Sequence, residues 1–381
     1  MTGVGGGLNV LALNAGSSSL KFGLYRVGSS RAEMLLSGED ESIGGGEAGN
    51  REAIARIAGR IADSKLPAPD AVGHRIVHGG PKLRSHCLVD GSVLRQLEGA
   101  AAFAPLHTPM ALAIIRFARE HFPRLPQVAC FDTAFHAGLP DVARVLPIPR
   151  HLQAEGIHRY GFHGLSCESI MRQLADDLPR RMVIAHLGNG ASITAVKDGK
   201  SVDTSMGLTP TGGVVMGTRS GDLDPGVLVY LMREKKLDAA MIEDLVDRRS
   251  GLLGLSGIAS DLRYLHEASE SNADARLAIQ MFCYSVRKQI AAMIAALDGI
   301  DLLVFTGGIG ENDAEARATI CSGLAWIGVS LDAARNRSAN HPINDRASRC
   351  EVRVLASQED EQIARHVRAL IPPVGHQGAI T

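Results

Sequence analysis

Two short hairpins built around glycine-rich turns constrain the fold of this chain more than any other feature of its sequence. In the first, an apolar run at 8–13 leads through a turn of glycine and serine into an alternating segment at 20–25. In the second, an apolar run at 182–186 leads through another glycine turn into 191–196, which is closed by Asp198-Gly199. Short apolar and alternating runs predict strands, and Asp-Gly is a strong hairpin signal.

The two hairpins resemble each other, because Gly16 and Gly188 hold equivalent places in them at a domain-sized interval. The repeat predicts two similar domains, and 381 residues are enough to build two cores. The alternative is a chance likeness, since turns made of small residues are frequent.

Helical and strand-like segments alternate along the rest of the chain, which predicts an α/β fold. Helices are expected at 108–122, at 274–297 and from Glu359 to the prolines at 372 and 373, and strands at 301–305 and 351–355. The apolar face of helix 274–297 predicts packing in the core or against a second copy of the chain, and consists of Leu277, Met281, Tyr284, Ile290 and Ile294. The polar, glycine-rich stretch 37–49 predicts a loop.

The composition excludes several classes of partner. Lys plus Arg is 40 and Asp plus Glu is 41, so the net charge of -1 gives no basic footprint for nucleic acid. No run of basic residues is long enough to predict binding to a membrane surface, and no apolar segment is long enough for a transmembrane helix. The 6 cysteines form no C-x-x-C pair, so they predict no zinc or redox site and fit free thiols in a reducing cytosol. With no signal peptide evident at the N-terminus, a cytoplasmic location is expected.

Three glycine-rich segments point to phosphate binding, and they lie at 14–21, 186–192 and 306–312. Glycine lets the backbone approach a ligand, and turn amides, hydroxyls and a helix N-terminus can hold phosphate oxygens. Lys21 adds a positive charge to the first segment. The spacing of a Walker A loop is absent, and the alternative is three tight turns in a glycine-rich protein.

Four charged or ionisable side chains stand out in other parts of the sequence. Arg75 and Arg219 lie among small residues, in what we expect to be loops, where a guanidinium can bind a carboxylate or phosphate; the alternative is an ordinary ion pair. Asp132 ends an apolar strand, which predicts either a cap or a magnesium ligand. His163, between glycines, is either structural or functional. No His-x-x-x-His or Glu-x-x-His spacing predicts a transition-metal site.

Seven strings of residues carry a resemblance that covers nearly the whole chain: NAGSSSLKF at 14–22, GHRIVHGG at 73–80, FDTAFH at 131–136, YGFHG at 160–164, HLGNGAS at 186–192, MGTRSGD at 216–222 and FTGGIGEN at 305–312. In this order they resemble the acetate and propionate kinases of the acetokinase family. The resemblance implies the duplicated two-domain fold of actin-like ATPases, shared with sugar kinases and Hsp70. It implies an N-terminal domain at 1–150, a nucleotide-binding and dimerising domain at 151–359, and a helix at 360–381 that returns to the first.

The resemblance also implies a role for each matching residue. Arg75 and Arg219 would hold the carboxylate and the transferring phosphoryl group, with His163 on its equatorial oxygens and Asp132 as the fourth catalytic residue. Ser17, Ser19 and Lys21 would line the phosphate path, and Asn14 and Glu359 would hold Mg2+ or Mn2+, with Asp132 orienting it. Besides Lys21, ATP would be bound by His186, Leu187, Gly188, Asn189, Gly190, Asp261, Leu262, Arg263, Gly307, Gly308, Ile309 and Gly310. Val77, Leu106, Phe162 and Pro210 would form a small apolar pocket for the methyl group.

The reaction implied is reversible, in-line phosphoryl transfer from ATP to acetate or another short-chain carboxylate, which gives acetyl phosphate and ADP, in a homodimer. A propionate or butyrate kinase, a sugar kinase and a nucleotide-gated binding protein of the actin or Hsp70 type are the alternatives. The chain departs from the family pattern at two places. Thr211-Gly212-Gly213 stands where the family usually has Leu-Glu-Gly, and Glu359-Asp360 stands where the family has a pair of glutamates.

Overall fold

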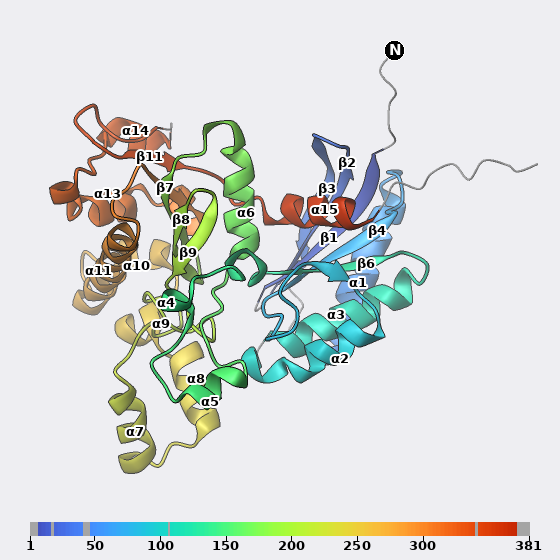
Figure 1. Cartoon of the computed structure of the whole chain (residues 1–381), viewed down its shortest axis with the longest axis horizontal. Coiled ribbons are helices and arrows are strands. Elements are labelled where there is room, and N and C mark those ends of the chain that lie inside the picture. Colours follow the sequence, from blue (N-terminus) through green and yellow to red (C-terminus); the bar gives the residue numbers. More distant parts are fainter. Residues whose placement is uncertain (1–6, 17–18, 41–45, 106, 340–341, 372–381) are drawn as a thin grey trace, which may run out of the picture. The chain divides into compact units, whose positions relative to one another are not determined.

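The chain divides into two units, each built on its own β-sheet (Figure 1). The computed structural model describes residues 7–16, 19–40, 46–105, 107–339 and 342–371. Unit 1 comprises Met1–Ala137, Gly164–Ser169 and Gln358–Thr381, and unit 2 comprises Gly138–His163 and Ile170–Ser357. Two predicted site residues, Ser17 and Leu106, lie outside the described residues.

Unit 1 contains a 6-stranded sheet in the order β3-β2-β1-β4-β6-β5. The strands are β1 (Leu8–Ala15), β2 (Leu20–Val27), β3 (Ala32–Asp40), β4 (Ala71–Ile76), β5 (Cys87–Leu88) and β6 (Gln127–Phe131). The first three form an antiparallel meander, and β1, β4 and β6 run parallel. The predicted first hairpin is β1 and β2, joined at the Gly16 turn.

Unit 2 repeats this arrangement in a 5-stranded sheet of order β11-β10-β7-β8-β9. The strands are β7 (Arg181–Leu187), β8 (Ala191–Lys197), β9 (Lys200–Thr204), β10 (Leu302–Thr306) and β11 (Glu351–Val354). Here too an antiparallel meander, β7 to β9, is extended by two parallel strands, β10 and β11. The α/β fold and the duplication predicted from the two hairpins are confirmed by the matching strand orders.

Helices cover both faces of the unit 1 sheet (Figure 1). The helices of this unit are α1 (Gly46–Asp63), α2 (Gly91–Gly99), α3 (Thr108–His121), the first turns of α6 (Gly164–Gln173), and α15 (Glu359–Leu370). Ile57 of α1 and Phe117 of α3 pack with Leu11 and Leu13 on one face. On the other face, Ile363 and other apolar residues of α15 pack against β1 and β6. The last helix of the chain is therefore part of the core of unit 1.

Unit 2 is rich in short helices. They are α4 (Asp141–Arg144), α5 (Arg150–Ala154), the end of α6, α7 (Pro225–Glu234), α8 (Ala239–Arg248), α9 (Gly251–Ser256), α10 (Leu262–Ala268), α11 (Ala273–Ala296), α12 (Gly307–Asn312), α13 (Ala314–Ser322) and α14 (Ala333–Ser338). The longest, α11, was expected at 274–297 and differs by one residue at each end.

Two expectations about these elements are wrong. Of the stretch 37–49 expected as a loop, residues 37–40 belong to β3, because this polar edge strand pairs with β2 as far as Asp40, and residues 46–49 belong to α1; residues 41–45 lie outside the described residues. Arg75 lies in β4, not in a loop. For the apolar face of α11, expected to pack in the core or against a second copy, Ile290 and Ile294 are buried, while Leu277, Met281 and Tyr284 are exposed on this chain.

The described part of the chain contains no helix that is both long enough and apolar enough to span a membrane. All six cysteines are free thiols: Cys87 is half-buried and the other five are buried. Burial raises the pKa of Cys87, Cys130, Cys283, Cys321 and Cys350, and for Cys283 the pKa reaches about 12. Protonated, enclosed thiols of this kind behave as small apolar side chains.

We predict that Gly73→Ala destabilises unit 1. Gly73 lies in β4 directly under α15, and a Cβ there would lie 2.5 Å from Ile363 Cγ2 and 2.6 Å from Val367 Cγ2. Because both methyl groups sit next to the helix backbone, α15 has to shift, and we expect a loss of about 1–3 kcal/mol in the free energy of unfolding by urea. The control is Gly59→Ala on α1, where nothing lies within 4 Å and a gain of about 0.5–1 kcal/mol is expected. Equal stability of the Gly73 variant and the wild type would contradict the packing.

Candidate active site

The predicted residues of unit 1 gather around one buried guanidinium group. Arg75 donates to Asp132 Oδ2 from both Nε (2.9 Å) and Nη2 (2.7 Å), and from Nη1 to Asn14 Oδ1 (3.1 Å). The amide of Asn14 in turn donates to Glu359 Oε2 (3.1 Å) and Asp360 Oδ1 (2.8 Å). Asn14 comes from the end of β1, Arg75 from β4, Asp132 from the residue after β6, and the two acids from the N-terminus of α15. Parallel strands deliver their carboxyl-end residues to one edge of a sheet, so these side chains meet there.

Negative charge exceeds positive charge in this cluster. Asp132 is fully buried, and burial raises the pKa of its carboxyl to about 6, with Arg75 opposing the rise and Glu359 and Glu168 adding to it. Burial likewise raises the pKa of Asp360. Burial disfavours the charge of Arg75, but the neighbouring acids raise its pKa overall. Three carboxyl groups thus lie near two positive groups, the buried guanidinium of Arg75 and the exposed Lys21 that acts on Asp360, and a further cation would stabilise this arrangement.

The same residues fit a hard divalent cation such as Mg2+. Asp132 Oδ1 is buried and has no hydrogen-bond partner within the described residues, so one carboxylate oxygen is available as a ligand. Glu359 and Asp360 offer further carboxylate oxygens beside it, the donor type that Mg2+ prefers. Asn14 uses its oxygen for Arg75 and its nitrogen for the acids, and so it also positions the charged groups around it.

In unit 2, the predicted residues gather around the turn between β7 and β8. His163 is buried, and its Nδ1 lies 2.9 Å from Ser192 Oγ of β8. Its ring stacks on that of His186, at the end of β7, with 4.2 Å between the centroids. A Cβ on Gly190 would lie 3.2 Å from His163 Nε2 and 3.3 Å from Arg219 Nη1. The turn therefore brings the imidazole and guanidinium groups together, and a glycine leaves them room.

His163 has an unusual backbone conformation that directs its side chain. Its φ of 58° is in the left-handed region, which is uncommon for residues other than glycine, and the residue is the N-cap of α6. Strained conformations of this kind concentrate at functional sites, where surrounding contacts hold them. The contacts here are the His186 ring and the Ser192 hydroxyl.

The third glycine-rich segment forms α12, directly after β10. Gly307 has a φ of 79°, and a Cβ there would lie 2.7 Å from the carbonyl oxygen of Leu187 and 3.2 Å from His186 Nε2. The segment is therefore packed against the second one, and Gly308 and Ile309 follow at the helix start. The short helix is held from below by Arg317 of α13, which donates through Nη1 to the carbonyls of Gly310 and Glu311, both at 2.9 Å.

Arg317 is a residue whose importance sequence reasoning missed. It is almost completely buried, and its other groups donate to Asn336 of α14, from Nε to Oδ1 at 2.8 Å and from Nη2 to the carbonyl at 2.6 Å. Asp360, Ser192 and Asp222 were missed as well: Asp222 Oδ1 accepts from the amide of Gly213 at 2.7 Å, in the loop that departs from the family pattern. In that loop, Thr211 also donates to Asp247.

The other predicted residues are more dispersed. Lys21 is exposed on β2, and the Ser19 hydroxyl donates to Glu39. Asp261 caps α10, and its Oδ2 lies 2.6 Å from Nη2 of the exposed Arg263. Leu262, between them in the sequence, is buried. Gly188 and the exposed Asn189 form the second turn. Of the predicted methyl pocket, Val77 lies in unit 1 and is half-buried, while Phe162 and Pro210 lie in unit 2 and are buried.

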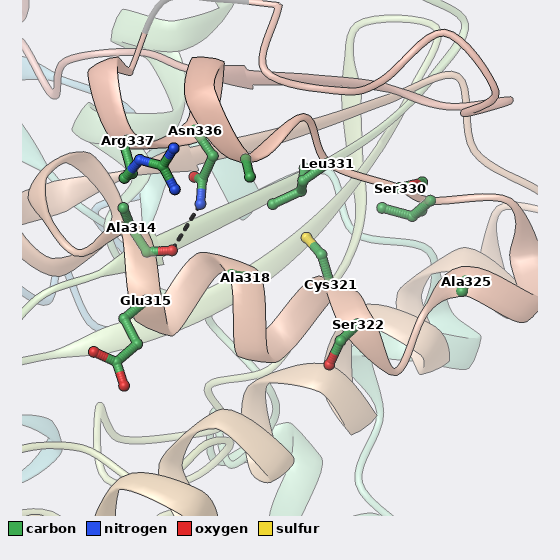
Figure 2. A pocket seen from close by; sticks show the side chains of 12 residues that line it. Ala314, Glu315, Ala318, Cys321, Ser322, Ala325, Ser330, Leu331, Asn336 and Arg337 are labelled. Atoms are coloured by element: carbon green, nitrogen blue, oxygen red, sulfur yellow. Dashed lines mark hydrogen bonds between the residues drawn. The ribbon is translucent and has the colours of Figure 1, made fainter.

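A separate cavity of about 540 Å³ lies in unit 2 beside α13 and α14 (Figure 2). It is lined by small and apolar groups such as Ala318 and Leu331, with Glu315 and Arg337 at its side. Figure 2 also shows the hydrogen bond from Asn336 Nδ2 to the carbonyl of Ala314, at 2.7 Å, which ties the two helices together. None of the residues lining this cavity is among the predicted site residues.

The duplicated sheets, each an antiparallel meander extended by parallel strands, fit an actin-like ATPase fold. The model of the acetokinase family matches residues 9–365. The chain belongs to the acetokinase family.

Relatives and solved structures agree with this placement. An acetate kinase of Methylocella silvestris is 43% identical, with 95% of this chain and 98% of the relative aligned, and one of Clostridium botulinum is 39% identical over 95% and 99%. A propionate kinase from Francisella tularensis superposes with a TM-score of 0.86 at 35% identity, and covers 96% of this chain and 100% of its own. An acetate kinase of Porphyromonas gingivalis gives 0.84, also at 35% identity and the same coverage.

We predict that Arg317→Lys destabilises unit 2 by about 2–4 kcal/mol. The guanidinium of Arg317 donates to carbonyls of both α12 and α14, and the ammonium group of a lysine cannot make all of these bonds, so buried carbonyls would be left unpaired. Urea unfolding followed by circular dichroism measures the change. The matched control is Arg335→Lys on the exposed face of α14, where a change within about 0.5 kcal/mol is expected. A similarly small change at Arg317 would show that the α12 segment is held by other contacts.

Proposed function

We propose that this chain is an acetate kinase that transfers the γ-phosphoryl group of ATP to acetate, reversibly, to give acetyl phosphate and ADP. The observation that carries the proposal is the convergence of His163, Arg219 and the glycine turn at Gly190. Nitrogen donors around a glycine turn suit an anion with several oxygens, such as a transferring phosphoryl group. Membership of the acetokinase family supports the same reaction.

The chemistry needs charge neutralisation and alignment more than covalent catalysis. A carboxylate oxygen of acetate attacks the γ-phosphorus in line, while the bond to the bridging oxygen of ADP breaks, and no proton has to be removed from the nucleophile. In this proposal Arg75 holds the acetate carboxylate, Arg219 binds the moving phosphoryl group, and His163 donates to its equatorial oxygens. His186 supports the His163 ring from the side.

Asp132, Glu359 and Asp360 would hold Mg2+ or Mn2+, and Asn14 would keep Glu359 and Asp360 in place. When bound, the ion supplies positive charge to the triphosphate. The glycine turn at Gly188–Gly190 and the start of α12 would take the nucleotide phosphates, since both present backbone amides next to His186. Lys21 and Ser19, with Ser17, are proposed for the phosphate path, and Asp261 and Arg263 for the border of the nucleoside.

We propose that Val77, Phe162 and Pro210, with Leu106, limit the acceptor to a methyl or ethyl group. The test is a hydroxamate assay, in which the protein is incubated with Mg-ATP and acetate, propionate or butyrate in turn. Acyl hydroxamate with acetate in excess over propionate is the expected result. A higher yield with propionate would mean that propionate, not acetate, is the preferred acceptor. If none of the three carboxylates gave an acyl phosphate, the proposed activity would be overturned.

A homodimer and a cytoplasmic location complete the proposal. The apolar side chains of α11 that the chain leaves exposed, Leu277, Met281 and Tyr284, favour the dimer over the core as their place of packing. Exposed apolar residues also occur on α7, among them Val227 and Tyr230. Apolar faces of this kind are typical of contacts between subunits.

We predict that Arg219→Ala lowers kcat on the order of 10³-fold, as loss of an arginine that neutralises a phosphoryl group does elsewhere. Steady-state kinetics with acetate and Mg-ATP measure the change, and the matched control is Arg180→Ala, an exposed arginine of the same unit. A loss of less than tenfold in the Arg219 variant would mean that this residue is structural.

The raised pKa of Asp132 predicts an acid limb in the pH profile. The carboxylate is needed in its ionised form, so kcat/KM should fall as the pH falls through about 6. Because a divalent cation binds the ionised form, more Mg2+ should move the limb to lower pH. The profile is measured at several Mg2+ concentrations with saturating acetate, and a limb that stays in place as Mg2+ rises would contradict this role.

A further inference from the structure

Three side chains from distant parts of the sequence meet in unit 1, and none of them is among the predicted site residues. They are His86, just before β5, Glu168 of α6 and His366 of α15. His86 Nε2 lies 3.3 Å from Glu168 Oε1, and His366 Nε2 lies 2.7 Å from Glu168 Oε2. The candidate ligand atoms of all three lie within 4.8 Å of one another.

The protonation of the cluster follows from its hydrogen bonds. The backbone N–H of Phe131 donates to His86 Nδ1 at 3.0 Å, so the proton of a neutral His86 ring is on Nε2 and points at Glu168. Burial alone would raise the pKa of Glu168, but hydrogen bonds from His366 and His86 lower it to about 2. Glu168 is therefore an ionised carboxylate that contacts both imidazole rings, which pack against each other with 3.8 Å between their centroids.

We propose that His86, Glu168 and His366 form a binding site for a divalent transition-metal ion of the zinc type. Two imidazole nitrogens and one carboxylate oxygen are a donor set that zinc takes in proteins, with a fourth position left for water. Magnesium and calcium prefer sets made of oxygen alone, so the two rings discriminate against them. The side chains are 12%, 18% and 21% exposed, which encloses the site but leaves a route for the ion.

The geometry also limits the affinity. For Nε2 of His86 to bind a metal, its proton has to move to Nδ1, which then faces the N–H of Phe131 instead of accepting from it. Loss of this bond weakens binding on the order of tenfold. We therefore expect Zn2+ to bind more weakly here than at a structural zinc site.

An ion in this site would connect two helices to the sheet edge. His366 lies two turns beyond Glu359 and Asp360 on α15, and Glu168 lies on the first turns of α6. The charge of Glu168 contributes to the raised pKa of Asp132, so a cation that neutralises it would also lower that pKa. The proposed site does not depend on the proposed acetate kinase activity.

The experiment uses the full-length chain after removal of metal with a chelator. Isothermal titration with Zn2+ is carried out with Mg2+ in excess, which occupies oxygen-only sites, and a parallel titration with Co2+ is followed by visible absorption. We expect one Zn2+ per chain, a visible band typical of a low-coordinate Co2+ site with nitrogen ligands, and a higher melting temperature with Zn2+.

His366→Gln is the main variant, since its side chain is partly exposed and glutamine can still donate to Glu168. It should weaken Zn2+ binding at least tenfold and abolish the Co2+ band and the melting shift, and His86→Gln should act alike. The matched control is His121→Gln, which removes an exposed imidazole of the same unit and should bind as the wild type does. Circular dichroism confirms folding, and a variant that fails to fold leaves the other histidine variant to decide.

Two results would overturn the proposal. The first is no heat and no Co2+ band with the wild-type chain up to millimolar metal, which would make the cluster a hydrogen-bonded link between helices only. The second is binding that persists unchanged in His366→Gln and His86→Gln, which would place the ion elsewhere.

Discussion

The structure of unit 1 depends on one buried ion pair, between Arg75 and Asp132. The carboxylate is completely enclosed, one of its oxygens accepts two bonds from the guanidinium, and the other has no partner among the described residues. A pair of this kind stabilises a fold little, because removing two charges from water costs about as much as their attraction returns. The pair matters because it links four elements. The ends of β1, β4 and β6 and the N-terminus of α15 each contribute a group that contacts the pair or its neighbours, so the pair holds these termini together.

Unit 2 carries different side chains at the ends of its equivalent strands. Where unit 1 has acidic groups at its strand ends, the equivalent turn of unit 2 has two stacked imidazoles and an arginine near a glycine. The duplicated sheet thus supplies the same strand-end geometry twice, and the side chains at the ends make one copy suited to cations and the other to anions. The left-handed His163 and the network of Arg317 hold the second copy in shape.

The sequence was most informative where local pattern decides structure. The hairpins, α3, α11 and the strand before α12 follow from periodicity and turn residues, and the seven family strings named residues that the structure gathers, such as Asn14, Arg75 and Asp132. Residues 37–40 could not be placed, because an edge strand exposed to water needs no apolar alternation. Arg317 and the cluster of His86, Glu168 and His366 could not be found either, because only folding brings these residues to their partners.

The place of α15 has a consequence for biosynthesis. The strands that this helix covers, β1, β4 and β6, all end by Phe131, whereas Ile363 and Val367 come much later in the sequence. A ribosome releases those strands long before the helix that completes their core. Until α15 has been synthesised, the nascent unit 1 exposes the apolar face of its sheet and lacks Glu359 and Asp360, so the acidic cluster can be completed only after this helix has left the ribosome.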